Sequence, residues 1–505
     1  MNRLTFGSYA KKNGGRVSIL FLLFLLALYE LVTAGLPIFA TVCVMPALVV
    51  VTLVLFEYRM LAFWSLIVIN YLVMAKWLTL PLPTSVPNEL LQILLLAFAL
   101  IDTQDSHFER SLNLMLLAIL TWCSFCTLEV LNDTCDIGID VGAWYTVARM
   151  IGYQLMYIFL VFTLYITSPK VLTRYLIVWG GLAFFAVFWV WKQKNIGFTD
   201  AENSFLQGRG RNTHLLQGGT LIRYFSIYSD AANFGIGIAS TAVAFIIFGI
   251  TAKIRKYKYF FLVVGVGCAW AMFISGTRTA IAAFMVGMMM YIFLSKSVRI
   301  AVPFTIIFGL FVFILAFTTI GNGNQQIRRM RSAFDKNDAS ANVRTMNQQA
   351  MKKYMAEAPW GIGMGVGYQN APANNKYTFM ATVPPDSEFV FIWIHTGIIG
   401  ITVFLCCMAL MLLGACRIVF FVLKSPSLRG IGAGCCCAFG SQLLGGYGNQ
   451  VLLQFPNCLA FFGGLTMVYI FPYLEKDWIV YEEEQLALEA EKKRLKLAKK
   501  EAKRV

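Results

Sequence analysis

The chain has 505 residues, of which 58% are hydrophobic and only 13% are charged, and its mean hydropathy is +0.67. These values exclude a soluble globular protein, whose charged fraction is about a quarter of its residues. We therefore expect an all-α polytopic membrane protein, because a helix satisfies its own backbone hydrogen bonds inside hydrocarbon.

Apolar stretches recur along the whole chain, most of them near the roughly twenty residues that a helix needs to cross about 30 Å of hydrocarbon. One of them is short and another is rich in Gly and Cys, so we predict about 12–14 transmembrane helices. The stretches lie at about residues 17–36, 37–56, 60–80, 88–102, 111–131, 143–167, 170–191, 231–251, 259–275, 279–295, 299–320, 387–416, 430–448 and 456–474.

Short basic connections indicate the orientation of the helices, since Lys and Arg in short loops remain on the inner side of the membrane. Residues 1–16, 253–258 and 295–299 are basic and fall on one side if the helices alternate. The opposite connections 81–88 and 132–140 contain no Lys or Arg. Both termini are then predicted inside.

The chain divides into four predicted regions. Residues 1–320 carry eleven helices and the outer segment 192–230, residues 321–386 form a large outer loop, and residues 387–474 carry three more helices. Residues 475–505 form a charged inner helical tail, predicted to lean on lipid headgroups rather than to form a coiled coil with a partner. Both outer segments are rich in Lys and Arg, which favours an anionic ligand at the outer face.

Arg278 interrupts an apolar run, in the sequence SGTRTA at 275–280. Gly276 permits a tight turn, Thr277 offers a hydroxyl, and the following helix begins beside the guanidinium. A helix N-terminus next to an arginine makes a small anion site. The alternative is an interfacial anchor or a structural salt bridge.

Arg223 lies just before the stretch at 231–251. Ser229, Asp230 and Asn233 stand where residues cap a helix, and capping explains them. Capping does not explain Arg223, whose planar guanidinium suits a phosphate because it donates two parallel hydrogen bonds and stays charged.

The outer loop ends at Asp386, Ser387 and Glu388, at the start of the stretch predicted for 387–416. Helix capping and the helix dipole favour acids there, but a carboxylate near two outer arginines is also a candidate general base. We expect His395 to lie about 10 Å deeper, at 1.5 Å per residue along one helix, and to be packed or to line a pore.

Two further features have structural interpretations. We expect an ion pair between Arg149 and Glu129. The glycine series at 361, 363, 365 and 367 follows Pro359 and predicts either a mobile flap or a plain loop.

Three sequence elements, in this order, resemble the O-antigen ligase and O-antigen polymerase superfamily of bacterial polysaccharide assembly. They are R-x-F-S-x-x-S-D-x-x-N-F-G at 223–235, S-G-T-R-T-A at 275–280, and a long outer loop ending in APWGIGMGVGYQN at 358–370, followed by DSEF and GIIG. The resemblance covers about residues 200–410.

The resemblance implies a fold like that of type-C glycosyltransferases and a reaction at the periplasmic face of the bacterial inner membrane. A glycan would move from undecaprenyl diphosphate to an acceptor hydroxyl on lipid A core or a similar glycan or lipid, with no cofactor, metal or nucleic acid. The essential arginines of the family fall on Arg223 and Arg278, and Arg344 resembles a further arginine of the outer loop. Membrane lipids are the other expected partners.

This chain departs from the family pattern at the position of the catalytic base. Ligases of the family usually carry a His-Asn pair where this chain has Asp386 and Ser387, so Asp386 is the first candidate and Glu388 the second. Asp230, Asn233, Thr277 and His395 are secondary site candidates. A repeat-unit polymerase, a protein O-oligosaccharyltransferase and a lipid-glycan flippase or transporter are the alternative functions.

Overall fold

The computed structural model describes residues 22, 51–52, 54–72, 85–101, 106–216, 221–296, 298–321, 323, 327–328, 331, 339–366, 375–382 and 387–501. The chain separates into two compact units, Met1–Trp64 and Ser65–Val505. The predicted stretches at 17–36 and 37–56 lie almost entirely outside the described residues. The features discussed below belong to the second unit.

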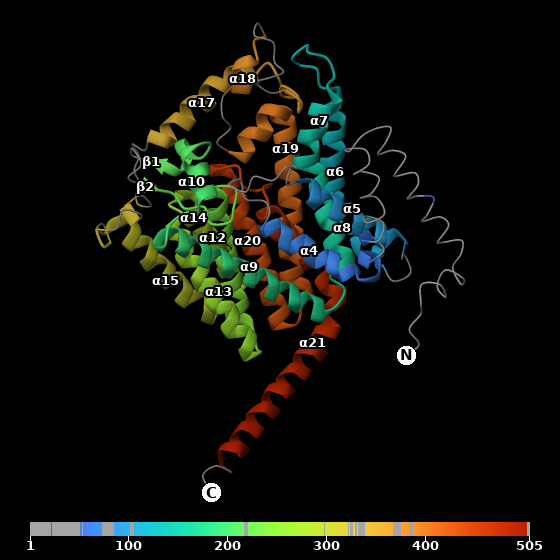
Figure 1. The fold of residues 1–505 in the computed structure, drawn as a ribbon, viewed down its shortest axis with the longest axis vertical. Helices are drawn as coiled ribbons and strands as arrows, with labels where there is room; N and C mark the ends of the chain where they lie inside the picture. Colours follow the sequence, from blue (N-terminus) through green and yellow to red (C-terminus); the bar gives the residue numbers. More distant parts are fainter. Residues whose placement is uncertain are drawn as a thin grey trace. The chain divides into compact units, whose positions relative to one another are not determined.

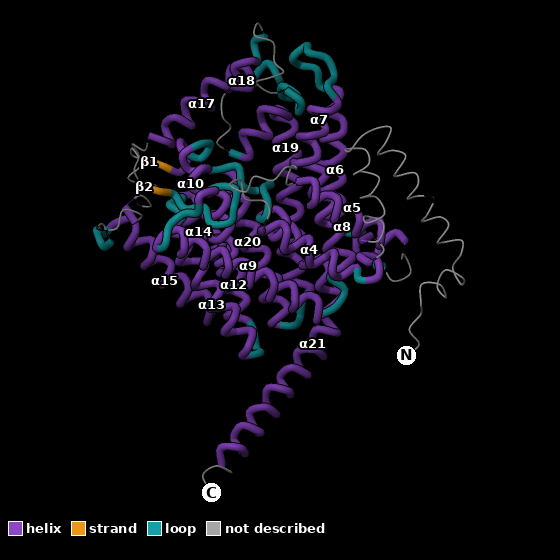
Figure 2. Tube along the Cα trace, viewed as in Figure 1, coloured by secondary structure: helices purple, strands orange, loops and turns teal. Residues whose placement is uncertain are grey.

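The described chain is almost entirely helical, with one short antiparallel pair of strands, as Figure 2 shows. The main helices are α4 (Arg59–Leu72), α5 (Ser85–Ile101), α6 (Leu114–Leu128), α7 (Val141–Ala148), α8 (Gln154–Tyr165), α9 (Pro169–Asn195), α10 (Asp200–Gln207), α11 (Arg211–His214), α12 (Ala231–Thr251), α13 (Arg255–Ile274), α14 (Arg278–Leu294), α15 (Val298–Phe317), α17 (Ala339–Met355), α18 (Thr378–Thr382), α19 (Glu388–Arg417), α20 (Pro426–Gly448) and α21 (Asn457–Glu501). The strands are β1 (Leu215–Leu216) and β2 (Leu221–Ile222).

Within the described residues, seven helical stretches are long and apolar enough to cross a membrane, which confirms a polytopic membrane protein. The shorter apolar helices are Arg59–Leu72, Pro87–Ile101 and Arg278–Leu294. Each predicted stretch from residue 60 onward overlaps at least one described helix, although residues 73–80 lie outside the described residues. The long stretches are Leu114–Leu131, Val141–Tyr165, Pro169–Asn195, Ala231–Thr251, Arg255–Ile274, Glu388–Val422 and Asn457–Lys496.

Small residues hold the centre of the bundle together, where α12, α14, α20 and α21 pack closely (Figure 1). In α20 the thiols Cys435, Cys436 and Cys437 are free and at most 2% exposed. Gly287 of α14 faces Ser441 of α20 so closely that a side chain at 287 would collide with it. Small side chains allow membrane helices to approach, and this approach brings the ends of α12, α14, α20 and α21 together.

The predicted ion pair between Arg149 and Glu129 is wrong. The guanidinium of Arg149 lies 3.0 Å from a carboxylate oxygen of Glu89, at the start of α5, and not beside Glu129. Glu129 instead accepts a hydrogen bond from the side-chain amide of Asn132, at 2.8 Å. The sequence placed Arg149 and Glu129 at similar depth, but depth alone does not decide which neighbouring helix a side chain faces.

The helix α21 extends well past the other helices toward the C-terminus in Figure 1, and carboxylates along it bind the starts of two other helices. Glu475 accepts hydrogen bonds from the backbone amides just before α20, at 2.6 Å. Glu489 accepts from the first two amides of α13, at 3.3 and 3.2 Å, and Glu482 binds the Lys253 ammonium at 2.6 Å. These carboxylates stand seven residues apart, so they lie on nearly the same face of the helix.

Candidate functional site

Of the described helices, α12, α14, α19 and α21 begin close together. The Thr277 hydroxyl, at the N-cap of α14, donates to the Ala231 carbonyl in the first turn of α12, at 2.8 Å. Asn457, the first residue of α21, donates to the Asn233 carbonyl of α12 at 2.9 Å. The partial positive charge at the start of each helix therefore adds to that of its neighbours, which favours an anion.

The structure places the guanidinium of Arg223 beside Thr277, the residue that precedes Arg278. One guanidinium nitrogen of Arg223 donates to the Thr277 hydroxyl at 3.0 Å, and another donates to the Thr213 carbonyl at 3.1 Å. Arg278 is the residue after Thr277 and the first residue of α14. Gly276 precedes them with φ +62°, a left-handed turn that ends α13 and starts α14. Both arginines are half-buried.

Asp230, Asn233 and Thr277 hold the helix starts in place. Asp230 caps α12 by accepting from the Ala232 and Asn233 amides, both at 2.9 Å, as predicted. The Asn233 side chain is buried and donates to the Phe455 carbonyl at 2.9 Å. Thr277 accepts from Arg223 and donates to α12 through one hydroxyl. These residues thus tie the arginines to the segment before α21.

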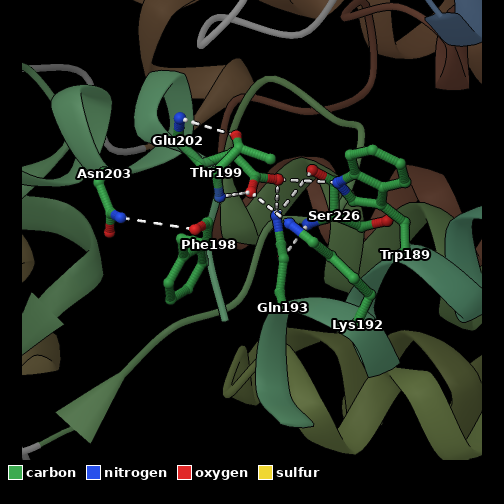
Figure 3. Close-up of polar contacts among 8 residues, drawn as sticks. All are labelled: Trp189, Lys192, Gln193, Phe198, Thr199, Glu202, Asn203 and Ser226. Atoms are coloured by element: carbon green, nitrogen blue, oxygen red, sulfur yellow. Dashed lines mark hydrogen bonds and ion pairs between the residues drawn. The ribbon is translucent and has the colours of Figure 1, made fainter. Parts of the chain in front are cut away.

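A buried carboxylate, that of Glu202, anchors the segment that leads to Arg223 (Figure 3). The Gln193 side chain of α9 bonds to both the backbone amide and the carbonyl of Ser226, at 2.9 and 3.2 Å. Ser226 lies three residues after Arg223 and has φ +54°. Glu202 has no exposed surface, and it accepts hydrogen bonds from the Trp189 indole (2.8 Å), the Lys192 ammonium (3.1 Å), the Gln193 amide (2.7 Å) and the Thr199 backbone amide (2.7 Å).

Hydrogen bonds around Glu202 stabilise its ionised form. Burial raises the pKa of the Glu202 carboxyl, but the hydrogen bonds from Thr199, Gln193, Trp189 and Lys192 lower it by more, so the pKa falls below its usual value. The carboxylate is therefore ionised at neutral pH and holds α10 against the end of α9.

The helix α19 is sharply bent at Gly397, whose φ is +66° and ψ −168°. In a straight helix Phe389 and Phe404 would be about 22 Å apart, at about 1.5 Å per residue. Their ring centroids are 6.4 Å apart, so the half at 388–396 folds back along the half at 398–417. His395 lies next to the bend, and Glu388 lies about 10 Å from it along the first half.

The expectation of a single straight helix over 387–416 is therefore wrong, whereas Glu388 and His395 do lie on one helical half, before the bend, and His395 is packed as expected. His395 Nδ1 bonds to the Phe391 carbonyl at 2.8 Å, its ring packs on the Phe391 ring at 4.3 Å, and its own carbonyl accepts from Gly363 at 3.1 Å. Its described contacts are those of a residue that holds the bend.

The glycine-rich motif fills this bend. The Ile362 amide donates to the Ile394 carbonyl at 2.9 Å, and the Ile399 amide donates to the Pro359 carbonyl at 3.3 Å. Gly361 has φ +81°, and a side chain there would strike the backbone at Gly397. The described part of the motif, 359–366, is therefore packed into the fold and not an open flap, whereas Gly367 lies outside the described residues.

Glu388 is buried, with 3% of its surface exposed, and it joins the segment between α20 and α21. One carboxylate oxygen accepts from the backbone amides of Leu452 and Leu453, at 3.1 and 3.5 Å. In the same segment the Asn449 side chain donates to the Thr279 hydroxyl of α14, at 3.0 Å. A single connection, 449–456, thus contacts both the helix that starts with Arg278 and the candidate base.

Sequence reasoning missed this connection. Its signal was present, since Asn449, Gln454 and Asn457 are polar residues crowded between two apolar stretches. The Gln454 side chain accepts from the Ser229 hydroxyl at 2.9 Å, next to the α12 cap.

Two predicted residues lie beyond what the structure describes. Asp386 falls in the undescribed stretch 383–386, although its neighbour Ser387 donates to the Gly446 carbonyl at 3.1 Å. Arg344 lies in α17, but its side chain is not described.

Comparison with known proteins agrees with the sequence elements. Residues 261–405 match the Wzy_C family model, described as O-Antigen ligase. This match confirms the predicted resemblance over the part of the chain that includes Arg278, the glycine-rich motif and Glu388. No curated protein matches the chain.

Proposed function

We propose that this protein transfers a glycan from undecaprenyl diphosphate to an acceptor hydroxyl, as an O-antigen ligase does, at the periplasmic face of the inner membrane. The observation that supports this most is the meeting of Arg223 with Thr277, next to Arg278, where four described helices begin. In this proposal both termini are cytoplasmic, and residues 192–230 and 321–386 are periplasmic.

The donor diphosphate carries about two negative charges at neutral pH and remains at headgroup level while its polyprenyl tail lies in lipid. Two guanidinium groups offset that charge, and the helix starts of α12, α14 and α21 add partial positive charge. The same groups stabilise the diphosphate when it leaves, and this is the stage at which charge accumulates. The proposed step needs no metal ion for that purpose.

In the proposed reaction the acceptor oxygen forms a bond to the anomeric carbon of the first donor sugar. The bond from that carbon to the diphosphate oxygen breaks, and the electron pair leaves with undecaprenyl diphosphate. A carboxylate takes the acceptor proton. Glu388 suits this role because backbone amides fix one of its oxygens and water is largely excluded around it. Asp386 remains the alternative base.

The test is Arg278→Ala in a deletion strain complemented with the gene. We expect loss of glycan transfer with normal membrane insertion. The matched control is Arg255→Ala, which truncates the side chain of the first residue of α13, at the far end of the same helical hairpin, and keeps the backbone amide that Glu489 binds. Undiminished transfer by Arg278→Ala would contradict the proposed function.

The glycan pattern of the deletion strain separates ligation from polymerisation. A ligase deletion leaves lipid A core without any long chain, whereas a polymerase deletion leaves core with one repeat unit. A shift in the mobility of exported glycoproteins would indicate protein glycosylation instead. Movement of the lipid-linked glycan across proteoliposomes, without a covalent product, would indicate a flippase.

A further inference from the structure

An arginine whose guanidinium has no hydrogen-bond partner among the described residues lies at the other end of the bundle from the candidate site. Arg110 belongs to a single helical turn, Phe108–Ser111, just before α6. Its guanidinium lies over the ring of Tyr473 of α21, with Cζ 5.8 Å from the ring centroid. Tyr473 is sixteen residues, or about 24 Å, along α21 from Asn457 in the candidate site. The Asn113 side chain donates to the Arg110 carbonyl at 2.9 Å, so the backbone is fixed and only the side chain lacks an acceptor.

Two neighbouring side chains here are buried without an acceptor or donor to pair with. The Nε and Nη1 atoms of Arg110 are buried and donate to no described residue. The hydroxyl of Ser111, a residue that is 5% exposed, is likewise buried and unpaired within the described chain. The adjacent carboxylate of Glu109 is exposed and bonds to His107 Nδ1 at 3.1 Å. Buried donors of a charged group cost free energy unless an acceptor is supplied, so this pair indicates a ligand with acceptor oxygens.

The exposed surface around Arg110 has the character of a boundary with lipid. Leu112 and Leu117 are 77% and 59% exposed, and α6 is one of the helices long and apolar enough to cross a membrane. The Tyr473 ring is 52% exposed, which is typical of tyrosine at a membrane–water interface. Arg110 as a whole is half-buried, so a ligand at this boundary reaches its guanidinium by a small rotation of the side chain. Acyl chains can then lie along the leucines while a headgroup meets the arginine.

A second arginine lies at the same end of the bundle. Arg417 is exposed in the last turn of α19, and Gly414, one turn before it, packs closely against Leu114 at the start of α6. Arg110 and Arg417 therefore bring two positive charges to one membrane face, which is the cytoplasmic face in the proposed topology. A guanidinium binds phosphate oxygens through two parallel hydrogen bonds, and basic sites between membrane helices on this face bind anionic headgroups.

We propose that Arg110 and Ser111 bind the phosphate of an anionic phospholipid, with the Tyr473 ring covering one face of the guanidinium. The bound lipid would join the turn before α6 to α21 and so stabilise the bundle at this end. The inference concerns a ligand other than donor and acceptor, and it does not depend on glycan transfer.

The test uses the full chain, purified in a non-ionic detergent and stripped of co-purified lipid, with phosphatidylglycerol added as the probe. Native mass spectrometry counts the bound lipid, and a thermal melt measures the stabilisation that it gives. We expect wild type to bind the lipid and to melt at a higher temperature. Arg110→Leu should bind it roughly tenfold more weakly or worse, because it loses hydrogen bonds to a charged group. The matched control is Arg174→Ala, at an exposed arginine of α9, which should bind as wild type does.

Melting without added lipid distinguishes a binding site from a structural anchor. Because the buried donors of Arg110 are unpaired in the lipid-free protein, Arg110→Leu should melt no lower than wild type there and should lose only the gain that lipid gives. Neither phosphatidylcholine nor inorganic phosphate should stabilise wild type as phosphatidylglycerol does.

Arg278→Ala should bind phosphatidylglycerol normally and transfer no glycan, so failure of this inference and failure of the proposed function are distinguishable. Three results would each overturn the inference: equal binding of phosphatidylglycerol by wild type and Arg110→Leu, equal stabilisation by inorganic phosphate, or a lower melting temperature of Arg110→Leu without lipid.

Discussion

Replacing Glu202 should loosen the segment that carries Arg223. Glu202→Ala removes four hydrogen bonds from a fully buried carboxylate and leaves the donors of Trp189 and Gln193 without an acceptor. Breaking a buried charged pair costs about 3–5 kcal/mol, but the Lys192 side chain is 17% exposed and regains water. We therefore expect about 3 kcal/mol of local destabilisation, or roughly a hundredfold in the opening equilibrium.

Glu202→Gln should have an intermediate effect. The oxygen that accepts from Trp189 and Gln193 can remain in place. The new amide nitrogen would then face the Thr199 amide and the Lys192 ammonium, which are themselves donors. We expect Glu202→Gln to destabilise this segment locally by about 2 kcal/mol, which is the cost of leaving such donors unsatisfied.

Hydrogen exchange read by mass spectrometry measures this local destabilisation directly. Peptides from 199–226 should lose roughly a hundredfold protection in Glu202→Ala, whereas peptides from α20 should be unchanged. Glu109→Ala, at an exposed carboxylate, is the matched control. A loss of protection below about threefold at 199–226 would show that the carboxylate does not hold this segment.

The pH dependence has a definite sign. Because the folded-state pKa of Glu202 lies below its ordinary value of 4.5, its contribution is fully present above that value. The contribution is lost as the pH falls through the lowered pKa. Protection of 199–226 should therefore be constant around neutral pH and decline only in acid, and Glu202→Gln should remove this decline.

The bend in α19 leads to two further predictions. Gly397→Ala should abolish most transfer at normal protein level, because φ +66° with ψ −168° is closed to alanine and the new side chain would collide with the Pro359 carbonyl. The control is Gly181→Ala, on an open face of α9, which should stay active in the same complementation assay. Phe389→Cys combined with Phe404→Cys should be joined by a flexible bifunctional thiol cross-linker, mapped by peptide mass spectrometry, because the two rings lie 6.4 Å apart. Failure to cross-link would mean that the two halves of α19 do not lie side by side.

Much of this fold could be predicted because the apolar stretches are long enough to cross a membrane and charges seldom interrupt them. Arg223 and Arg278 could be singled out from the sequence because they lie at the ends of apolar stretches, at positions that helix capping does not explain. The contact between Arg223 and Thr277 depends on tertiary packing, which the sequence does not show.

The bend could not be predicted in this way. Residues 388–417 form one uninterrupted apolar run, and a glycine inside such a run is compatible with a straight helix. The bend exists because Gly361 and Gly397 approach each other from segments far apart in sequence, and hydropathy carries no information about that contact. The Arg149 partner and the 449–456 connection were missed for the same reason. Both depend on which helices are neighbours.

The carboxylates of α21 make the C-terminal helix a part of the folded bundle well beyond its apolar portion. Glu475 binds the start of α20, and Glu482 and Glu489 bind the start of α13. Of these three contacts that of Glu489 lies nearest the C-terminus, so unwinding of α21 from its C-terminal end as far as Glu489 would begin to release the start of α13. A processive protease that starts at the C-terminus would consequently meet its first cooperative barrier at Glu489. The protease would remove the residues beyond Glu489 first, with little effect on the stability of the helical bundle.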